Sequence, residues 1–225
     1  MIYSPDHNFL LLKNKKVGGT SLEVPLSMVV PDNAIVTPRT DYHPDWLIKD
    51  EPEYPGYRPR NYENGFYNHM PYYEIAEKIE IALARTYVFV RHPYSSVLSH
   101  FFHRLYHINK EVFNWGALTK EEQTKLVDQY FNNELGWDWY SSSLQLYFDK
   151  YGKVIIDDFL YYEKGIESEI NKVLPMHGIP TIKLDIKEKA FRPTDVRPRD
   201  VFEDRHLELI QANWAWEFDN LNYVR

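Results

Sequence analysis

Residues 13–21, with the sequence KNKKVGGTS, combine three kinds of group that bind phosphate. Two adjacent glycines let the backbone approach a ligand closely. Two hydroxyls and a lysine add donors and charge, and a helix starting here would add N–H groups and a partial positive charge. The Walker A spacing G-x-x-x-x-G-K-[ST] is absent. A Gly-Gly turn with an N-capping Thr fits this segment equally well. The candidate binding residues are Lys16, Gly18, Gly19, Thr20 and Ser21.

A second candidate anion site follows the clearest strand pattern, at 86–90. Arg91 ends that strand, and Ser99 follows eight residues later in a predicted helix. An arginine fork plus a hydroxyl suits a phosphate monoester. Taken alone, this segment favours the alternative of an Arg at a strand end and a Ser facing a neighbouring helix.

The elements that must position these residues alternate along the chain. Strands are predicted at 9–13, 34–37, 86–90 and 153–157, and helices at 20–30, 71–84, 94–106, 120–132, 140–151, 163–177 and 204–218. Pro25 falls within or near the first turn of its helix, where proline is tolerated. This order predicts an α/β fold with a mostly parallel sheet flanked by helices. Both anion segments would lie at carboxyl ends of strands, where such sheets bind ligands.

Residues 38–70 interrupt this alternation with five prolines and many tyrosines. Long loops in compact domains tend to be functional or disordered, and the tyrosine content argues against disorder. The tyrosines at 54–73 would stack on a sugar ring or anchor the loop, so the acceptor class stays open. We expect one domain over 1–225 with a long irregular insertion at 38–70.

Composition excludes several classes of function. The net charge of −7 excludes a general nucleic-acid binder. The absence of cysteine excludes disulfides and Cys-ligated metals, and no compact set of His, Asp and Glu predicts a metal site. No signal-peptide pattern and no apolar run of roughly 20 residues occurs, so a cytoplasmic protein without a membrane span is expected.

Taken together, the two anion segments resemble sulfotransferases that use 3′-phosphoadenosine 5′-phosphosulfate (PAPS). Lys-x-Gly-Gly-Thr-Ser at 16–21 resembles their 5′-phosphosulfate loop, and Phe-Val-Arg-His-Pro-Tyr-x-x-Val-x-Ser at 89–99 resembles their 3′-phosphate motif. Asn68 to Tyr72 resembles a segment of the carbohydrate branch, which includes heparan sulfate 2-O-sulfotransferases. Weaker similarity at 157–163, 178–180 and 217–223 extends the resemblance over residues 9–223.

Three positions depart from the family pattern. Lys15 stands where Pro or Gln usually precedes the motif lysine. His92 replaces the usual Asp or Asn, and Ser96 stands where many members carry a basic residue. None of these changes removes a phosphate donor, although His92 would tune the site differently.

The resemblance implies a P-loop-like fold and a role for each candidate residue. Lys16 would stabilise charge on the bridging oxygen of the leaving nucleotide. The residues at 18–21 would bind the 5′-phosphosulfate, and Arg91 with Ser99 would bind the 3′-phosphate. The acceptor would be a small molecule or carbohydrate that presents a hydroxyl or amine.

The acceptor also needs a general base. His69 is the first choice because its context matches the branch that uses histidine, and neutral imidazole accepts protons near pH 7. His43 is the second candidate and Glu63 the third. A surface or structural role competes for any of the nine histidines.

Other basic residues have less defined roles. Arg192, Arg197 and Arg199 crowd a late segment that in this family often closes over the donor, although a solvated loop is slightly favoured. Lys13 and Lys15 are expected to be solvated.

Two rival functions remain open at this point. A small P-loop kinase would need a Gly-Lys-Ser/Thr motif, which is missing, and an acidic magnesium ligand after a strand. Asp157 and Asp158 are only loose candidates for that ligand. A non-catalytic nucleotide- or glycan-binding module with a degenerate sulfotransferase fold is the second rival, and the intact Lys16, Arg91 and Ser99 count against it.

Overall fold

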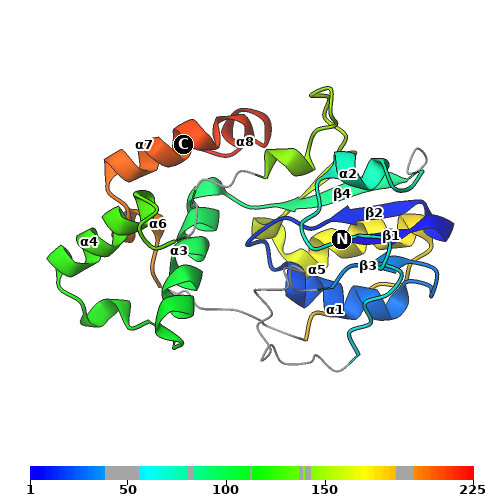
Figure 1. Cartoon of the computed structure of the whole chain (residues 1–225), viewed down its shortest axis with the longest axis horizontal. Helices are drawn as coiled ribbons and strands as arrows, with labels where there is room; N and C mark the ends of the chain where they lie inside the picture. Colours follow the sequence, from blue (N-terminus) through cyan, green and yellow to red (C-terminus); the bar gives the residue numbers. More distant parts are fainter. Residues whose placement is uncertain (39–55, 81–83, 112, 137–138, 140–142, 186–194) are drawn as a thin grey trace. The chain divides into compact units, whose positions relative to one another are not determined.

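The computed structural model describes residues 1–38, 56–80, 84–111, 113–136, 139, 143–185 and 195–225. They form two compact units, each described here by itself (Figure 1). Unit 1 comprises Met1–Val90 with Ser143–Glu188, and unit 2 comprises Arg91–Ser142 with Lys189–Arg225. The predicted α/β class is confirmed, because one five-stranded sheet is combined with helices. None of the described helices is both long and apolar enough to cross a membrane.

The sheet of unit 1 is mixed rather than mostly parallel. Its strands are β1 (Ile2–Ser4), β2 (Phe9–Leu12), β3 (Ile35–Val36), β4 (Arg85–Val90) and β5 (Asp158–Tyr161), in the order β3-β1-β2-β4-β5. β2 pairs parallel with β4, and β4 pairs parallel with β5, as expected. The unpredicted β1 is antiparallel to both neighbours. It is only three residues long, too short to show a hydrophobic period.

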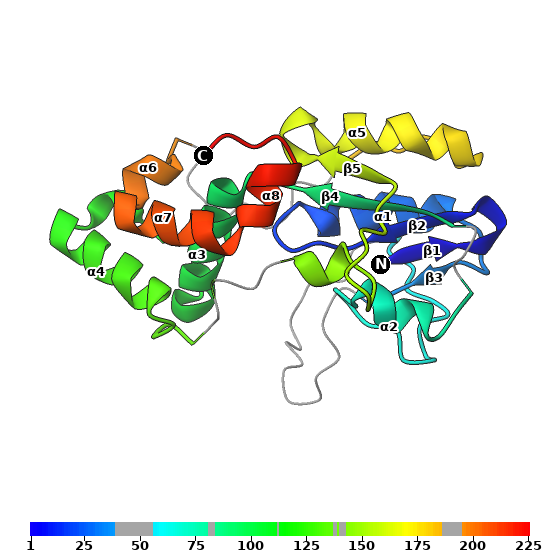
Figure 2. The same ribbon diagram turned by 90° about the horizontal axis from the view of Figure 1, so that it is seen from above.

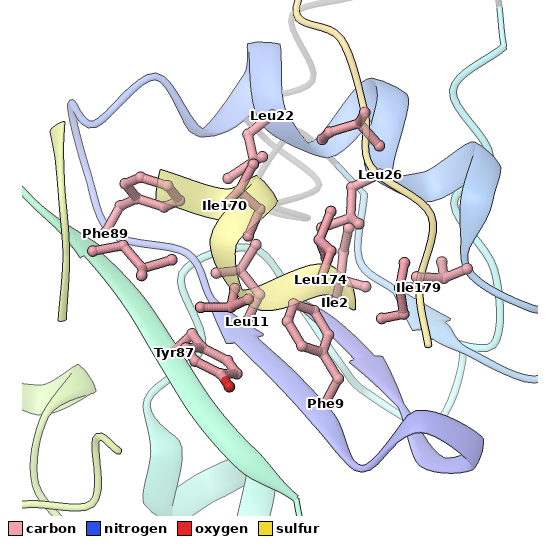
Figure 3. Close-up of a cluster of buried hydrophobic side chains, with 14 of the residues drawn as sticks. Ile2, Phe9, Leu11, Leu22, Leu26, Tyr87, Phe89, Ile170, Leu174 and Ile179 are labelled. Atoms are coloured by element: carbon pink, nitrogen blue, oxygen red, sulfur yellow. The ribbon is translucent and has the colours of Figure 1, made fainter. Parts of the chain in front are cut away.

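Two helices, α1 (Gly19–Val29) and α5 (Ile166–Val173), cover one face of the sheet. Figure 3 shows Leu22 and Leu26 of α1 and Ile170 of α5 meeting Leu11 and Phe89 of the strands. Full burial of such side chains stabilises the fold by about 1.5–3 kcal/mol each. The short α2 (Tyr72–Ala76) lies on the opposite side of the sheet from α5 (Figure 2). This packing fixes the carboxyl ends of β2, β4 and β5 at one edge.

Unit 2 is helical, with an aromatic core. Its helices are α3 (Pro93–Asn109), α4 (Lys120–Phe131), α6 (Pro198–Val201), α7 (Asp204–Asn213) and α8 (Ala215–Asn220). Phe101, Phe102 and Trp115 are among the buried rings packed between these helices. At the start of α4, the Thr119 hydroxyl accepts a hydrogen bond from the Glu122 N–H at 3.3 Å, and the Glu122 carboxylate accepts from the Thr119 N–H at 2.8 Å. This capping box fixes the predicted start of α4.

Several predicted elements are shorter or broken. Short 3₁₀ turns occur at Pro5–His7, Trp115–Ala117, Leu144–Leu146, Tyr162–Lys164 and Leu174–His177. The helix predicted at 163–177 begins only after Gly165, whose φ is 90°, and becomes 3₁₀ beyond Val173. The helix predicted at 71–84 ends early, at Ala76, where the chain continues in a turn over residues 77–79. Residues 81–83 lie outside the described residues.

The elements predicted at 140–151 and 153–157 are wrong. Residues 140–142 lie outside the described residues, and after Leu146 the chain turns instead of continuing a helix. The Asp149 carboxylate accepts the N–H groups of Tyr151 and Lys153, each at 2.9 Å, and Gly152 has a φ of 78°. The turn leaves only an isolated bridge at Val154, and the strand itself starts at Asp158. Local turn chemistry therefore outweighs the apolar pattern.

Candidate functional site

The loop between β2 and α1 lies at the carboxyl end of a strand, as predicted. The predicted helix start at Thr20 is wrong by one residue, and neither Thr20 nor Ser21 is the N-cap. The cap is Gly18, with φ 73° and ψ 22°, and the helix starts at Gly19. Gly19, Thr20 and Ser21 therefore form the first turn, whose N–H groups point out of the end of the helix. Such N–H groups suit an anion.

Both glycines have close neighbours, and Gly18 also has a backbone conformation that favours glycine. A Cβ on Gly18 would lie 2.4 Å from Cδ1 of Ile166, and its positive φ disfavours any other residue. A Cβ on Gly19 would lie 3.2 Å from Cε of Lys13. The loop is therefore packed tightly between α5 and the lysine stem.

Lys16 occupies a left-handed conformation with φ 60°. For a residue other than glycine this costs about 1–2 kcal/mol, and such outliers cluster at functional sites. The residue is partly buried, immediately before Val17 and the Gly18 cap. This backbone conformation places a lysine within two residues of the N-cap of α1.

Proline 25 lies deeper in α1 than expected. The helix runs from Gly19 to Val29, so Pro25 is inside it, beyond the first turn. Proline has no N–H and removes one bond of the helical ladder. The prediction that Pro25 falls near the first turn is therefore wrong.

Lys13 is buried rather than solvated, which corrects the sequence prediction. Its Nζ lies 2.5 Å from Oε2 of Glu23, and the two residues are only 8 % and 2 % exposed. A buried charge is stable only when paired, so Glu23 of α1 explains why Lys13 points inward. Lys15 is exposed, as predicted.

Asn14, which the sequence analysis missed, ties the loop to its neighbours. Its Nδ2 donates to the Phe89 carbonyl at 3.0 Å and to the Tyr147 hydroxyl at 3.1 Å. Its Oδ1 accepts from the Lys15 N–H at 2.7 Å and from the Ser143 hydroxyl. The side-chain partners lie far away in sequence, so no local pattern could reveal this role.

His69 faces the same loop. Its Nδ1 lies 2.9 Å from the backbone carbonyl oxygen of Lys13. A carbonyl only accepts hydrogen bonds, so Nδ1 carries the proton and Nε2 carries the lone pair of the neutral ring. Burial, together with the nearby Lys13 ammonium, holds the pKa of His69 well below 6.5. The ring is therefore a neutral imidazole with its basic nitrogen directed away from Lys13.

The backbone that carries His69 is anchored rather than loose. The Arg60 guanidinium donates to four carbonyls, including those of Ser27 at 3.0 Å and Val30 at 2.8 Å near the end of α1. The Tyr57 hydroxyl donates to the Thr37 carbonyl at 2.6 Å. The described part of the 38–70 segment thus packs onto unit 1, and His69 adopts a left-handed φ of 59°.

The other candidate bases are less well placed or not described. Glu63 is exposed in the turn of residues 62–66, where the N–H groups of Gly65 and Phe66 bond to the Tyr62 carbonyl. His43 and Tyr54 lie outside the described residues. Among the predicted bases, His69 is therefore the one with a described contact to the β2–α1 loop.

The second anion motif belongs to unit 2. Arg91 directly follows β4 and precedes His92, the N-cap residue of α3. Ser99 lies in the second turn of that helix, and both Arg91 and Ser99 are partly buried. The structure thus places this pair in unit 2, whereas Lys16, residues 18–21 and His69 are together in unit 1.

His92, the departure from the family pattern, has a structural role. Its Nε2 lies 3.1 Å from the Val224 carbonyl oxygen. Its ring lies 5.2 Å from that of Tyr94, 5.8 Å from that of Phe218 and 5.1 Å from that of Tyr223, between centroids. These contacts attach the start of α3 to the end of the chain.

Only two of the three arginines near the end of the sequence, Arg197 and Arg199, are among the described residues. Arg192 lies outside the described residues. Arg197 is exposed, and its backbone N–H donates to the Asp200 carboxylate at 2.7 Å. Arg199 is exposed, 3.8 Å from the Asp204 carboxylate. These positions fit a solvated segment.

The acidic residues considered for magnesium lie at the wrong edge of the sheet. The Asp157 carboxylate accepts the Thr86 N–H at 2.7 Å, and Asp158 pairs with Arg85 at 2.9 Å. Thr86 and Asp158 stand at the amino ends of β4 and β5, opposite the edge that bears the glycine loop. Within the described part of the chain, no three His, Cys, Asp or Glu residues gather as metal ligands. This arrangement counts against a P-loop kinase.

Comparisons with models of protein families, with curated proteins and with solved structures found no match. A functional proposal therefore depends on the residues of the site.

Proposed function

We propose that this chain is a sulfotransferase with a P-loop-like fold, which transfers a sulfuryl group from PAPS to a hydroxyl or amine. The observation that carries this proposal is the neutral His69, bonded through Nδ1 to the first residue of the loop that contains Lys16. A base, a lysine and a helix N-terminus then share one loop. Sulfuryl transfer to a hydroxyl needs these three kinds of group.

The donor would bind along two segments. The first turn of α1, at Gly19, Thr20 and Ser21, would hold the 5′-phosphosulfate through backbone N–H groups and hydroxyls. Arg91 and Ser99 would hold the 3′-phosphate, an assignment that follows from the resemblance of residues 89–99 to the family motif. A 3′-phosphate contact would select PAPS over nucleotides of the ATP type.

The reaction would proceed by in-line displacement. The acceptor oxygen forms a bond to sulfur, while the bond between sulfur and the bridging phosphate oxygen breaks. The electron pair of that bond remains on the leaving adenosine 3′,5′-bisphosphate, where the Lys16 ammonium stabilises the growing charge. The hydroxyl proton passes to Nε2 of His69. A carbohydrate is a suitable acceptor, because tyrosines flank the base at Tyr67, Tyr72 and Tyr73 and aromatic faces stack on sugar rings.

The decisive binding experiment is calorimetry with adenosine 3′,5′-bisphosphate and with ADP. The proposal predicts tight binding of the bisphosphate and much weaker binding of ADP. Arg91→Ala should weaken bisphosphate binding while changing ADP binding little, because ADP has no 3′-phosphate. Equal affinity for the two nucleotides, or no binding of either, would refute the donor assignment.

Transfer is measured separately, with donor carrying ³⁵S and a panel of carbohydrate and small hydroxyl or amine acceptors. Bisphosphate binding without transfer to any acceptor would identify the chain as a non-catalytic nucleotide-binding module. Magnesium-dependent phosphoryl transfer from ATP, with no sulfuryl transfer from PAPS, would instead favour the kinase-like alternative.

A further inference from the structure

Two histidines of α3 lie one helical turn apart and face each other. Nε2 of His103 is 3.1 Å from Nε2 of His107. The ring centroids are 4.5 Å apart, and the ring planes are nearly perpendicular, at 84°. Both side chains are partly buried on the wall of the helix, whereas Phe102 and Leu105 on its other side are in the core.

We infer that His103 and His107 form a bidentate site for a divalent transition-metal ion. A metal bound by imidazole lies about 2.0–2.1 Å from each nitrogen. If an ion forms bonds of that length to two nitrogens 3.1 Å apart, the angle N–metal–N is about 100°. This value lies between the octahedral and the tetrahedral angle. The distance between the nitrogens therefore matches two neighbouring positions of either geometry, and each ring has to turn so that its lone pair points at the ion.

Binding needs only a local change of protonation. In the contact as described, one Nε2 donates its proton to the lone pair of the other Nε2. When a metal binds, both Nε2 atoms must present lone pairs, so the donating ring moves its proton to Nδ1. This tautomer change leaves the net charge of each ring unchanged, and the shared hydrogen bond is replaced by two metal–nitrogen bonds.

The chemistry of the pair selects the ion. Imidazole nitrogens suit Zn²⁺, Ni²⁺ and Cu²⁺, whereas Mg²⁺ and Ca²⁺ prefer oxygen ligands. Among the described residues no third His, Asp or Glu joins the pair. Water would complete the coordination, so binding should be in the micromolar range and reversible.

The histidine pair belongs to a different unit from the proposed base and catalytic lysine, although it shares α3 with Ser99. His103 and His107 lie in unit 2, whereas Lys16 and His69 lie in unit 1. Zinc binding is measured without nucleotide and sulfuryl transfer without zinc, so failure of one proposal is distinguishable from failure of the other.

The test is calorimetric titration of the untagged protein with ZnCl₂ at pH 7.5, with MgCl₂ as the control ion. One zinc ion should bind per chain, and magnesium should not bind. His103→Gln and His107→Gln should each weaken zinc binding at least about 100-fold, because each removes one of two ligands. His100→Gln is the matched control on the same helix, since Nδ1 of His100 instead contacts the Tyr130 hydroxyl at 2.7 Å. It should bind zinc like the wild type.

Two further measurements keep the test decisive. Circular dichroism must show each variant folded, and in wild-type NMR spectra zinc must shift the ring signals of His103 and His107. Affinity should also fall at pH 5.5, because protons compete for imidazole. Wild-type binding no stronger than that of the His103→Gln/His107→Gln double variant would overturn the inference, as would zinc shifts confined to other histidines.

Discussion

Nδ1 of His69 lies 2.9 Å from the backbone carbonyl oxygen of Lys13, although 56 residues separate them in the sequence. This hydrogen bond joins the segment before α2 to the glycine loop before α1. It fixes the tautomer of the ring and directs Nε2 away from the loop backbone. Residues 13–18, which connect β2 to α1, therefore contain the proposed catalytic lysine and also bind the ring of the proposed base.

Replacement of His69 should affect turnover far more than donor binding. His69→Gln keeps an amide that can still donate to the Lys13 carbonyl, but it removes the basic nitrogen. We expect kcat to fall by about 10²–10⁴-fold, the usual contribution of a general base. Calorimetry should show adenosine 3′,5′-bisphosphate affinity changed less than about 3-fold. Glu63→Gln and His43→Gln are the controls, and a comparable loss in either would transfer the role of base to that residue.

In the pH–rate profile, the loss of activity toward acid should begin only below pH 6.5. A general base works only in its neutral form, and burial with Lys13 nearby holds the pKa of His69 well below 6.5. Activity should therefore stay constant as the pH falls to 6.5 and decline only below it. A decline centred at or above pH 6.5, measured in the free enzyme through kcat/KM, would contradict this environment for His69.

Lys16→Ala should abolish transfer without unfolding the protein. The ammonium is assigned to charge that develops only in the transition state, so kcat should fall by about 10²–10³-fold or more. Lys15→Ala is the matched control, because it removes an adjacent lysine that is exposed. Thermal melting should be nearly unchanged in both variants. Equal losses of activity in the two variants would point to general electrostatics instead of a specific role for Lys16.

Gly18→Ala should destabilise the fold more than Gly152→Ala. Both glycines have positive φ, 73° and 78°, so both substitutions incur about 1–2 kcal/mol of backbone strain. At Gly18 the new Cβ would also meet Ile166 at 2.4 Å, whereas at Gly152 nothing lies within 4 Å. Urea unfolding should show the larger loss at Gly18, and Ile166→Ala should reduce the difference. Identical losses would mean that Ile166 does not constrain the loop.

The contribution of the buried ion pair Lys13–Glu23 to stability can be measured by removing one of its two charges. Glu23→Gln leaves the Lys13 ammonium buried without its carboxylate, and we expect a loss of about 3–5 kcal/mol in the free energy of unfolding. The apolar double variant Lys13→Met/Glu23→Leu should recover part of this loss, because the Lys13 ammonium is then absent. The buried Met1 ammonium, which lies 3.4 Å from Glu23 Oε1, loses that carboxylate and keeps, among the described residues, only the Thr37 hydroxyl. If Glu23→Gln were as stable as the wild type, the Lys13 ammonium would have to reach solvent without cost.

Glu217 predicts a dependence of stability on pH. It is 3 % exposed, and within the described part of the chain no other side chain hydrogen-bonds to either carboxylate oxygen. Burial raises the pKa of Glu217 from 4.5 to about 7. The folded state therefore favours the protonated acid. Its stabilisation is complete below pH 4.5 and is lost as the pH rises through about 7. At about 1.4 kcal/mol per unit of pKa shift, the free energy of unfolding falls by about 3 kcal/mol between low pH and a pH above the folded-state pKa.

Glu217→Gln removes this dependence. The variant should be more stable than the wild type by about 2–3 kcal/mol at pH 8, and by much less at pH 5. Urea unfolding at the two pH values measures both differences. An equal gain at both would mean that Glu217 does not titrate in this range. Asp219→Asn is a suitable control, because Asp219 lies on the same helix and pairs with Arg225 at the surface.

Local sequence patterns predicted the strands before the two anion motifs and the helices after them. Val88, Val90 and the residues around them are apolar in a short run, and Pro93 marks the first turn of α3. These features depend on neighbours within a few residues, so they can be recognised without tertiary structure. The strand at 153–157 was misplaced because the Asp149 turn and the pairing of Asp158 with Tyr87 decided its start.

The sequence by itself determined the α/β class, the glycine loop after β2 and the position of Arg91 after β4, and it predicted His69 as one of three candidate bases. Only the tertiary structure decided that Lys13 is buried against Glu23 and that Asn14 holds the loop to β4. It also decided that His69 is neutral and bonded to the loop. The physical reason is that burial and long-range hydrogen bonds depend on residues brought together by folding, whereas helix, strand and turn preferences are set by near neighbours.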